Sequence, residues 1–381
     1  MRIPLAAIRV LSVLLACAGA GAAWPQARPP VGPGQTVVHT ALGGFILGYD
    51  IDQTGTEGIL SEALTRADGR ADVAVETFDQ HTGAIIKVLR QELDSKNDYV
   101  TLGIFGNHVA LTEFEHVKTL FVDKRRYLLS DPIDANAITG KWTPPFNSEA
   151  DHIIDGGAVS QGFDTALFFG FKNTADDFHT YLFTSNVGAN TFGPEIAVDD
   201  PIFDWNNSPA IAHDPVHQQA ILGGSFGCFG CNIEIGFVDL VTGHQSTTGG
   251  RGLGYVNGIA VDPNTRIVCT TSEDDFSVEF YDLKKGTSRI VVLPGATSQA
   301  QSGGAVAVDP LHKLFLVGQE FSSTAASGSS IQVFDEKGNF VESLNGFSLP
   351  ASPAYMALNP AQRSGFVIVT PDLTTLQSFT Y

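Results

Sequence analysis

The second half of the chain alternates between short apolar runs and polar turn residues. Four such runs follow one another in the unit 255–297: Gly258–Val261, Arg266–Thr271, Ser277–Tyr281 and Ser288–Leu293. Alternation by twos is typical of a half-buried β-strand, and Asp, Asn, Pro and Gly between the runs are typical of turns. The pattern therefore predicts four antiparallel strands in this one unit.

A four-residue motif, Ala-x-Asp/Asn-Pro, ends the first predicted strand of four successive units. Its copies are Ala212–Pro215, Ala260–Pro263, Ala307–Pro310 and Ala357–Pro360. The acidic or amide residues Asp214, Asp262, Asp309 and Asn359 are spaced by 48, 47 and 50 residues. A fixed period in this range indicates an array of equal supersecondary units, and four strands per unit is the pattern of a propeller blade.

A second motif, an aromatic residue or Val followed by Asp and then Gly, recurs after the third predicted strand of several units. It occupies 78–83, 238–243, 281–286 and 334–338. Asp can accept hydrogen bonds from backbone amides two residues on, and Gly takes the positive φ of a hairpin turn. The motif therefore predicts a tight hairpin between the third and fourth strands.

The whole chain divides into seven units of this kind. They span 42–95, 98–145, 150–200, 205–250, 255–297, 302–348 and 352–381. The last has room for only three strands, and we expect Gln35–Thr40 to supply its fourth. The prediction is a single all-β propeller of seven four-stranded antiparallel blades over 35–381, closed by an N-terminal strand. The alternative is a separate β-rich domain at 36–145.

These repeats resemble those of the NHL, YVTN and SMP-30-like propellers, in which Ala-Val-Asp-Pro and a later Phe/Tyr-Asp-x-x-x-Gly are common. The resemblance is good over 205–381 and weak over 36–200. It implies a propeller architecture. The superfamily includes lactonases, electron-transfer proteins and scaffolds, so the fold alone does not choose a function.

The N-terminus has the pattern of an export signal over residues 1–23. Arg2 and Arg9 precede an apolar run, Val10–Ala23, which ends in small residues and is shorter than the about 20 residues of a spanning helix. A proline-rich linker follows at 24–34. We expect a periplasmic or extracellular protein, with a membrane anchor only if Cys17 is lipidated.

The formal net charge of −19 opposes binding to nucleic acid or anionic membranes. It fits an exported protein, which we expect to be a monomer without a cofactor.

Propeller sites usually lie at the mouth of the central channel, on loops that precede the innermost strands. The equivalent positions here are Ser208, Asn257, Gly304 and Ala354. In SMP-30-like enzymes, Glu, Asn and Asp from several blades hold a channel metal. Only Ser208 and Asn257 are polar in this set, whereas a hard cation takes about six oxygen ligands, so no metal site is predicted.

The stretch 204–208 is the most site-like loop of the sequence. Asp204, Trp205, Asn206 and Ser208 combine an aromatic face with polar groups, a combination suited to a glycan or polar small molecule. We predict that these residues and Asn257 bind a ligand. The alternative for Trp205 is packing between blades.

Two further groups have titratable side chains. His108, Glu113, Glu115 and His116 could form an acid–base cluster, but a solvated strand face is the preferred interpretation, with Asp123–Arg126 as a charged turn. The second group offers possible oxygen and nitrogen ligands, but its spacing matches no metal motif; its members are Asp151, His152, Asp155, Asp164, Asp176, Asp177 and His179.

Cys228 and Cys231 have CxxC spacing, and we predict a local disulfide between them, with free thiols as the alternative. Cys269 is then unpaired.

The sequence identifies no reaction, and whether the protein is an enzyme stays open. We predict a binding module for an envelope protein, a glycan or a small molecule. A lactonase- or hydrolase-like enzyme with a channel-mouth site is the first alternative, and a structural scaffold is the second.

Overall fold

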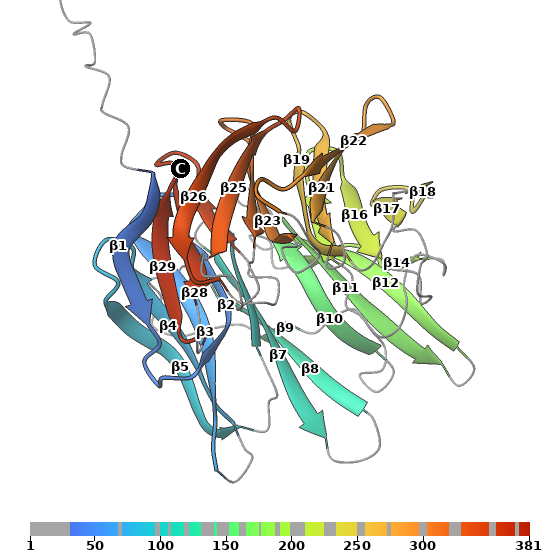
Figure 1. The fold of residues 1–381 in the computed structure, drawn as a ribbon. Helices are drawn as coiled ribbons and strands as arrows, with labels where there is room; N and C mark the ends of the chain where they lie inside the picture. The colour runs from blue at the N-terminus through green and yellow to red at the C-terminus, as the bar shows by residue number, and fades with distance from the viewer. Residues whose placement is uncertain are drawn as a thin grey trace, which may run out of the picture. The chain divides into compact units, whose positions relative to one another are not determined.

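The computed structural model describes the chain from residue 31 onward, with gaps. The described ranges are 31–67, 71–95, 100–105, 108–117, 122–130, 141–142, 152–159, 165–174, 177–186, 191–198, 210–224, 234–249, 256–272, 276–296, 303–319, 329–349, 356–369 and 373–381. Within these ranges the regular structure consists of β-strands and no helix (Figure 1). This confirms the all-β prediction.

The described strands of the first half lie in three antiparallel sheets. The first contains β2 (Phe45–Ile51), β3 (Glu57–Thr65), β4 (Ala71–Asp79) and β5 (Ile85–Ser95). The second contains β6 (Val100–Phe105), β7 (His108–Val117), β8 (Val122–Ser130) and β9 (Lys141–Trp142). The third contains β10 (His152–Val159), β11 (Thr165–Thr174), β12 (Asp177–Asn186) and β13 (Thr191–Phe192), with β14 (Ile196–Val198) also paired to β12.

The described strands of the second half lie in four more sheets. These are β15 (Ala210–Asp214), β16 (Gln219–Gly224), β17 (Glu234–Asp239) and β18 (Gln245–Gly249); then β19 (Val256–Asp262), β20 (Ile267–Ser272), β21 (Ser277–Asp282) and β22 (Thr287–Val292). Next are β23 (Gly303–Asp309), β24 (Leu314–Gln319), β25 (Ser329–Asp335) and β26 (Phe340–Phe347). The last sheet joins β27 (Met356–Asn359), β28 (Ser364–Val369) and β29 (Thr375–Thr380) to β1 (Gly32–His39).

The first strands of the sheets form a closed series of contacts. Going along the chain, β2 contacts β6, β6 contacts β10, and the series continues through β15, β19, β23 and β27, which contacts β2 again. Residues 32–381 make up one compact unit. This ring of sheets is the arrangement of a propeller, and it leaves 36–145 within the same unit as the repeats.

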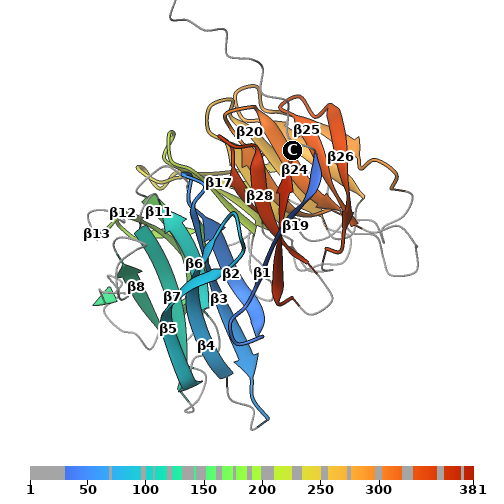
Figure 2. The same ribbon diagram turned by 90° about the vertical axis from the view of Figure 1, so that its left-hand side faces the viewer.

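The N-terminal strand closes the last sheet, as the sequence predicted. In the register, Val37 lies opposite Gln377 and Val38 opposite Leu376, so β1 runs beside β29 (Figures 1 and 2). The strand begins at Gly32 instead of Gln35, with an irregular register between Pro33 and Val37. Pro33 has no N–H to donate, and an edge strand tolerates this loss.

The repeated Asp or Asn residues end the inner strands and shape the turns after them. Asp214, Asp262, Asp309 and Asn359 are all fully buried. Their side-chain oxygens accept backbone N–H groups from His217, Asn264, His312 and Gln362, at 3.0, 2.8, 2.9 and 3.2 Å. Each turn ends in a residue with positive φ: Gln218, Arg266, Lys313 and Arg363. These residues are therefore turn formers, as predicted, because their oxygens are used by the backbone.

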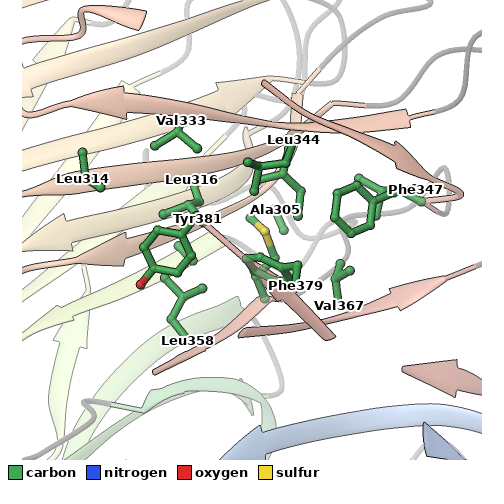
Figure 3. Close-up of a cluster of buried hydrophobic side chains, with 14 residues drawn as sticks. Ala305, Leu314, Leu316, Val333, Leu344, Phe347, Leu358, Val367, Phe379 and Tyr381 are labelled. Atoms are coloured by element: carbon green, nitrogen blue, oxygen red, sulfur yellow. The ribbon is translucent and has the colours of Figure 1, made fainter. Parts of the chain in front are cut away.

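Apolar side chains pack between neighbouring sheets. Phe379 and Tyr381 from the closing sheet lie against Leu316 and Phe347 of the β23–β26 sheet (Figure 3). The Tyr381 hydroxyl donates a hydrogen bond of 3.0 Å to Asp309 Oδ2, which ties the C-terminus to a repeat turn. Burial and the adjacent Asp309 carboxylate both raise the pKa of Tyr381.

The charged segment Asp123–Arg126 is not the turn that the sequence suggested. It lies inside β8, where the register places Arg126 opposite Glu113 and Lys124 opposite Glu115 on β7. The segment is part of a strand because its backbone pairs with β7 along its whole length.

Candidate functional site

Most of the predicted ligand-binding residues fall outside the described part of the chain. Asp204, Trp205, Asn206 and Ser208 lie in the gap 199–209. Cys228 and Cys231, as well as Cys17, also lie outside the described residues, so the predicted disulfide and lipid anchor stay predictions.

Asn257 lies at an irregular position within an inner strand. It is the second residue of β19, and the pairing with β20 shifts between Val256 and Gly258. Gly304, the equivalent residue of β23, lies in a similar irregularity between Gly303 and Val306. The sequence placed both residues before their strands, and the structure places them on bulges inside the strands.

The same irregularity occurs in two inner strands of the first half. The register shifts between Ile46 and Gly48 in β2, and between Ile154 and Gly156 in β10. Asp155 therefore occupies in β10 the position that Asn257 occupies in β19. Bulges are frequent beside binding and catalytic sites, where they redirect a side chain.

The sequence itself indicates that Asp155 and Asn257 occupy equivalent positions. Ile154-Asp155-Gly156 and Val256-Asn257-Gly258 share the pattern of a β-branched residue, a polar residue and glycine. Gly258 has a reason to be glycine, since an added Cβ would lie 2.5 Å from the carbonyl oxygen of Gly304 on the next inner strand.

Two glutamates are buried together between the first sheet and the loop that follows the closing strand. Glu62 on β3 accepts backbone N–H groups from Leu42 and Gly44, at 2.6 and 2.8 Å. Glu76 on β4 accepts the N–H of Ala41 at 3.2 Å. The pair thus holds the 41–44 loop, and both side chains are inaccessible to solvent.

Glu76 keeps its proton at neutral pH in this environment. Burial raises its pKa to about 8, and the adjacent Glu62 adds to the shift through a hydrogen bond and charge repulsion. Glu76 Oε1 is buried without a donor from any described residue. A proton on Glu76, shared with Glu62, satisfies this oxygen. The sequence does not predict this pair, because no spacing motif relates Glu62 to Glu76.

A cleft of about 580 Å³ opens between the β19–β22 and β23–β26 sheets. Its charged lining residues are Lys284, Lys285, Arg289, Lys313 and Lys337, with Asp282 and Glu336. We call this the cationic cleft. Its five cations come from 22 in the whole chain, and its lining has a net charge of +3 in a protein of −19.

Hairpin turns place these cations. The Asp282 carboxylate accepts the backbone N–H groups of Lys284 and Lys285, at 2.9 and 3.1 Å, in the turn before β22. In the equivalent turn before β26, Asp335 accepts the N–H of Lys337 at 2.8 Å. The predicted hairpin motif is confirmed, and it puts lysines on the rim of the cleft.

Exposed apolar side chains lie on the same turns of the β23–β26 sheet. Leu311, two residues before Lys313, is 66% exposed, and Phe340, three residues after Lys337, is 47% exposed. Val341 is exposed beside Phe340. Exposed apolar groups gathered on one part of a surface mark sites of protein–protein contact, where Phe and Arg are enriched.

The remaining described groups do not form a reactive centre. Cys269 is buried and has no disulfide partner, and burial raises the pKa of its thiol. Among the residues that the structure describes, no three His, Cys, Asp or Glu side chains are grouped to hold a metal ion. Nor does this part of the chain contain a helix with the length and apolar character needed to cross a membrane.

Comparisons with known proteins identify the fold alone. No family model matches the sequence, and no curated protein does. Among solved structures, 918 chains are similar. One is a β-propeller chain of the crystal structure of the mitotic checkpoint complex, with a TM-score of 0.61 and 13% identity over 95% of this chain and 96% of that chain. The chain therefore has a propeller-like repeat fold, and the number of blades stays a prediction.

Proposed function

We propose that this protein is an exported β-propeller that acts as a binding module for another protein of the envelope or the extracellular space. Export is supported by the charged and apolar pattern of residues 1–23. We also infer that its repeats are of the NHL, YVTN or SMP-30-like kind. The buried Asp or Asn at the end of each inner strand in the second half, and the Asp–Gly hairpins, support this inference.

One observation favours a protein partner: exposed Leu311, Phe340 and Val341 lie within four residues of Lys313 or Lys337, which line the cationic cleft. Anchoring groups of this kind combine apolar contact with charge complementarity, which together give affinity and orientation. The similar chain from a multiprotein complex is consistent with such a role.

Cross-linking in the native host tests the proposal. The full-length protein, treated with a lysine-reactive cross-linker and analysed by mass spectrometry, should form links to one or a few proteins through Lys284, Lys313 or Lys337. Leu311→Ser/Phe340→Ser should reduce the yield at least about threefold, since each lost anchor weakens binding. No partner above the level of an uncross-linked control would contradict the proposal.

A small-molecule site at the inner-strand bulges is the second candidate. The equivalent positions of Asp155 and Asn257 favour it. An Asn257→Ala variant in the same experiment separates the two. We expect this variant to form the same cross-links as the wild type. A loss of cross-links would indicate that the partner binds at the bulges and not at the cationic cleft.

A further inference from the structure

We infer that the cationic cleft binds an acidic, extended peptide segment of the partner protein. This inference rests on the proposed function and names the chemistry of what is bound. It follows from the charge balance of the cleft, from the strand along its edge and from the spacing of its cations.

The charge balance leaves three cations of the cleft without a carboxylate partner. Lys285 pairs with Asp282 at 2.7 Å, and Lys313 lies 3.7 Å from Glu336. No described carboxylate forms an ion pair with the three that remain: Lys284, Lys337 and Arg289. In a chain of net charge −19, such a group of unpaired cations gives a local field that attracts anions.

Arg289 is already oriented towards the other wall of the cleft. Its guanidinium donates hydrogen bonds to the carbonyl oxygen of Lys337, at 2.6 Å, and to Asn339 Oδ1, at 3.0 Å. These bonds join β22 to the β25–β26 turn. They fix the distance between the two walls before anything binds, which lowers the entropic cost of binding.

The edge of the cleft is an outer strand. β22 pairs only with β21 among the described strands, and its residues Thr287, Ser288 and Arg289 line the cleft. The free edge of a strand offers unpaired N–H and C=O groups to an added strand. A peptide extended along β22 would form main-chain hydrogen bonds there, while its side chains reach the lysines.

The spacing of the cations favours a peptide over a single small anion. Lys284, Lys313 and Lys337 come from three different turns. Several carboxylates distributed along a chain can reach all three, whereas one phosphate or citrate fills little of about 580 Å³.

Fluorescence anisotropy with the full-length protein tests the inference. The probe is a labelled, end-blocked peptide in which Asp or Glu alternates with Val or Thr, and its control has Asn and Gln in place of the acids. We expect saturable binding of the acidic peptide that weakens as salt is added, because ion pairs at a surface are screened. The neutral peptide should bind at least about tenfold more weakly.

Variants locate the binding to the cleft. Lys284→Glu/Lys337→Glu should weaken acidic-peptide binding at least about tenfold, since two attractions become repulsions. Lys284→Arg/Lys337→Arg should stay within about twofold of the wild type, because the charge is kept. Lys87→Glu, on β5 of the first sheet, reverses one charge at a position that does not line the cleft and should leave binding unaltered. Circular dichroism checks that every variant is folded.

Three outcomes would overturn the inference: equal binding of the acidic and neutral peptides, an unchanged affinity in the charge-reversed variant, or citrate binding as tightly as the peptide. The proposed function is judged separately. Cross-links to a partner that survive Lys284→Glu/Lys337→Glu would uphold the binding module while overturning the acidic segment. Binding of the acidic peptide without any cross-linked partner would instead uphold the acidic-peptide site while overturning the binding module.

Discussion

Carboxyl groups in this protein serve two different purposes, which their hydrogen-bond partners separate. The carboxylates of Asp214, Asp262 and Asp309 are buried but satisfied by backbone N–H groups and by nearby side chains. Glu76 is equally buried, yet one of its oxygens has no donor and it lies next to a second acid. The first group stabilises turns by accepting backbone N–H groups, and Glu76 stabilises the 41–44 loop with its pKa raised.

Protonation of Glu76 should make stability depend on pH. Its pKa is raised to about 8 in the folded protein, above the ordinary value of the unfolded chain, so the folded state binds a proton that the unfolded state releases. The contribution of Glu76 to the free energy of unfolding should therefore fall as the pH rises from about 4.5 to about 8. Buried His213, whose pKa is lowered to about 4, has the opposite effect between about pH 4 and 6.5. Urea unfolding at a series of pH values measures this.

The variant Glu76→Gln keeps a neutral donor beside Glu62 and should flatten this pH dependence. Glu57→Gln on the same sheet is the control and should keep the wild-type slope. An identical pH dependence in the wild type and in Glu76→Gln would show that Glu76 is ionised in the fold.

At the level of elements, the sequence predicted well the strands whose side chains alternate clearly between apolar and polar. It did not predict the bulges or the strand within a charged segment. Predicted Arg266–Thr271 and Ser277–Tyr281 correspond to β20 and β21 within one residue at each end. The bulges at Asp155 and Asn257 were missed, because a bulge depends on how the paired strand is aligned. The strand through Asp123–Arg126 was not predicted, because its pairing with β7 cannot be read from the charged segment alone.

The closing strand β1 offers a test of how much one strand contributes to the free energy of unfolding. Val38 is fully buried against the first and last sheets, whereas Val37, on the other face of β1, is 37% exposed. Val38→Ala should lower the free energy of unfolding by about 1.5–3 kcal/mol, since it removes buried methyl groups and leaves a cavity. Val37→Ala is the matched control, with an expected change below about 0.5 kcal/mol. Equal effects in urea unfolding would mean that β1 does not pack as described.

At the scale of the whole molecule, closure makes every sheet depend on its neighbours. The chain of contacts from β2 through β27 returns to β2, and β1 joins the two ends of the sequence in one sheet. Opening any one sheet exposes the apolar faces of the sheets beside it.

This dependence predicts that residues 32–381 unfold in one cooperative transition. Calorimetry should give a single peak with a calorimetric enthalpy close to the van't Hoff enthalpy. Two separated peaks would instead indicate that 36–145 is an independent domain.

The sequence by itself determined the repeat, the all-β class, the turn role of Asp214 and its equivalents, and the strand that closes the last sheet. These follow from local physics: side-chain alternation, turn propensities and a fixed period along the chain. Tertiary structure alone decided the burial of Glu76 beside Glu62 and the gathering of Lys284, Lys313 and Lys337 around one cleft. Those features join turns and strands that are far apart in the sequence, and a pKa or an electrostatic field depends on distance in space.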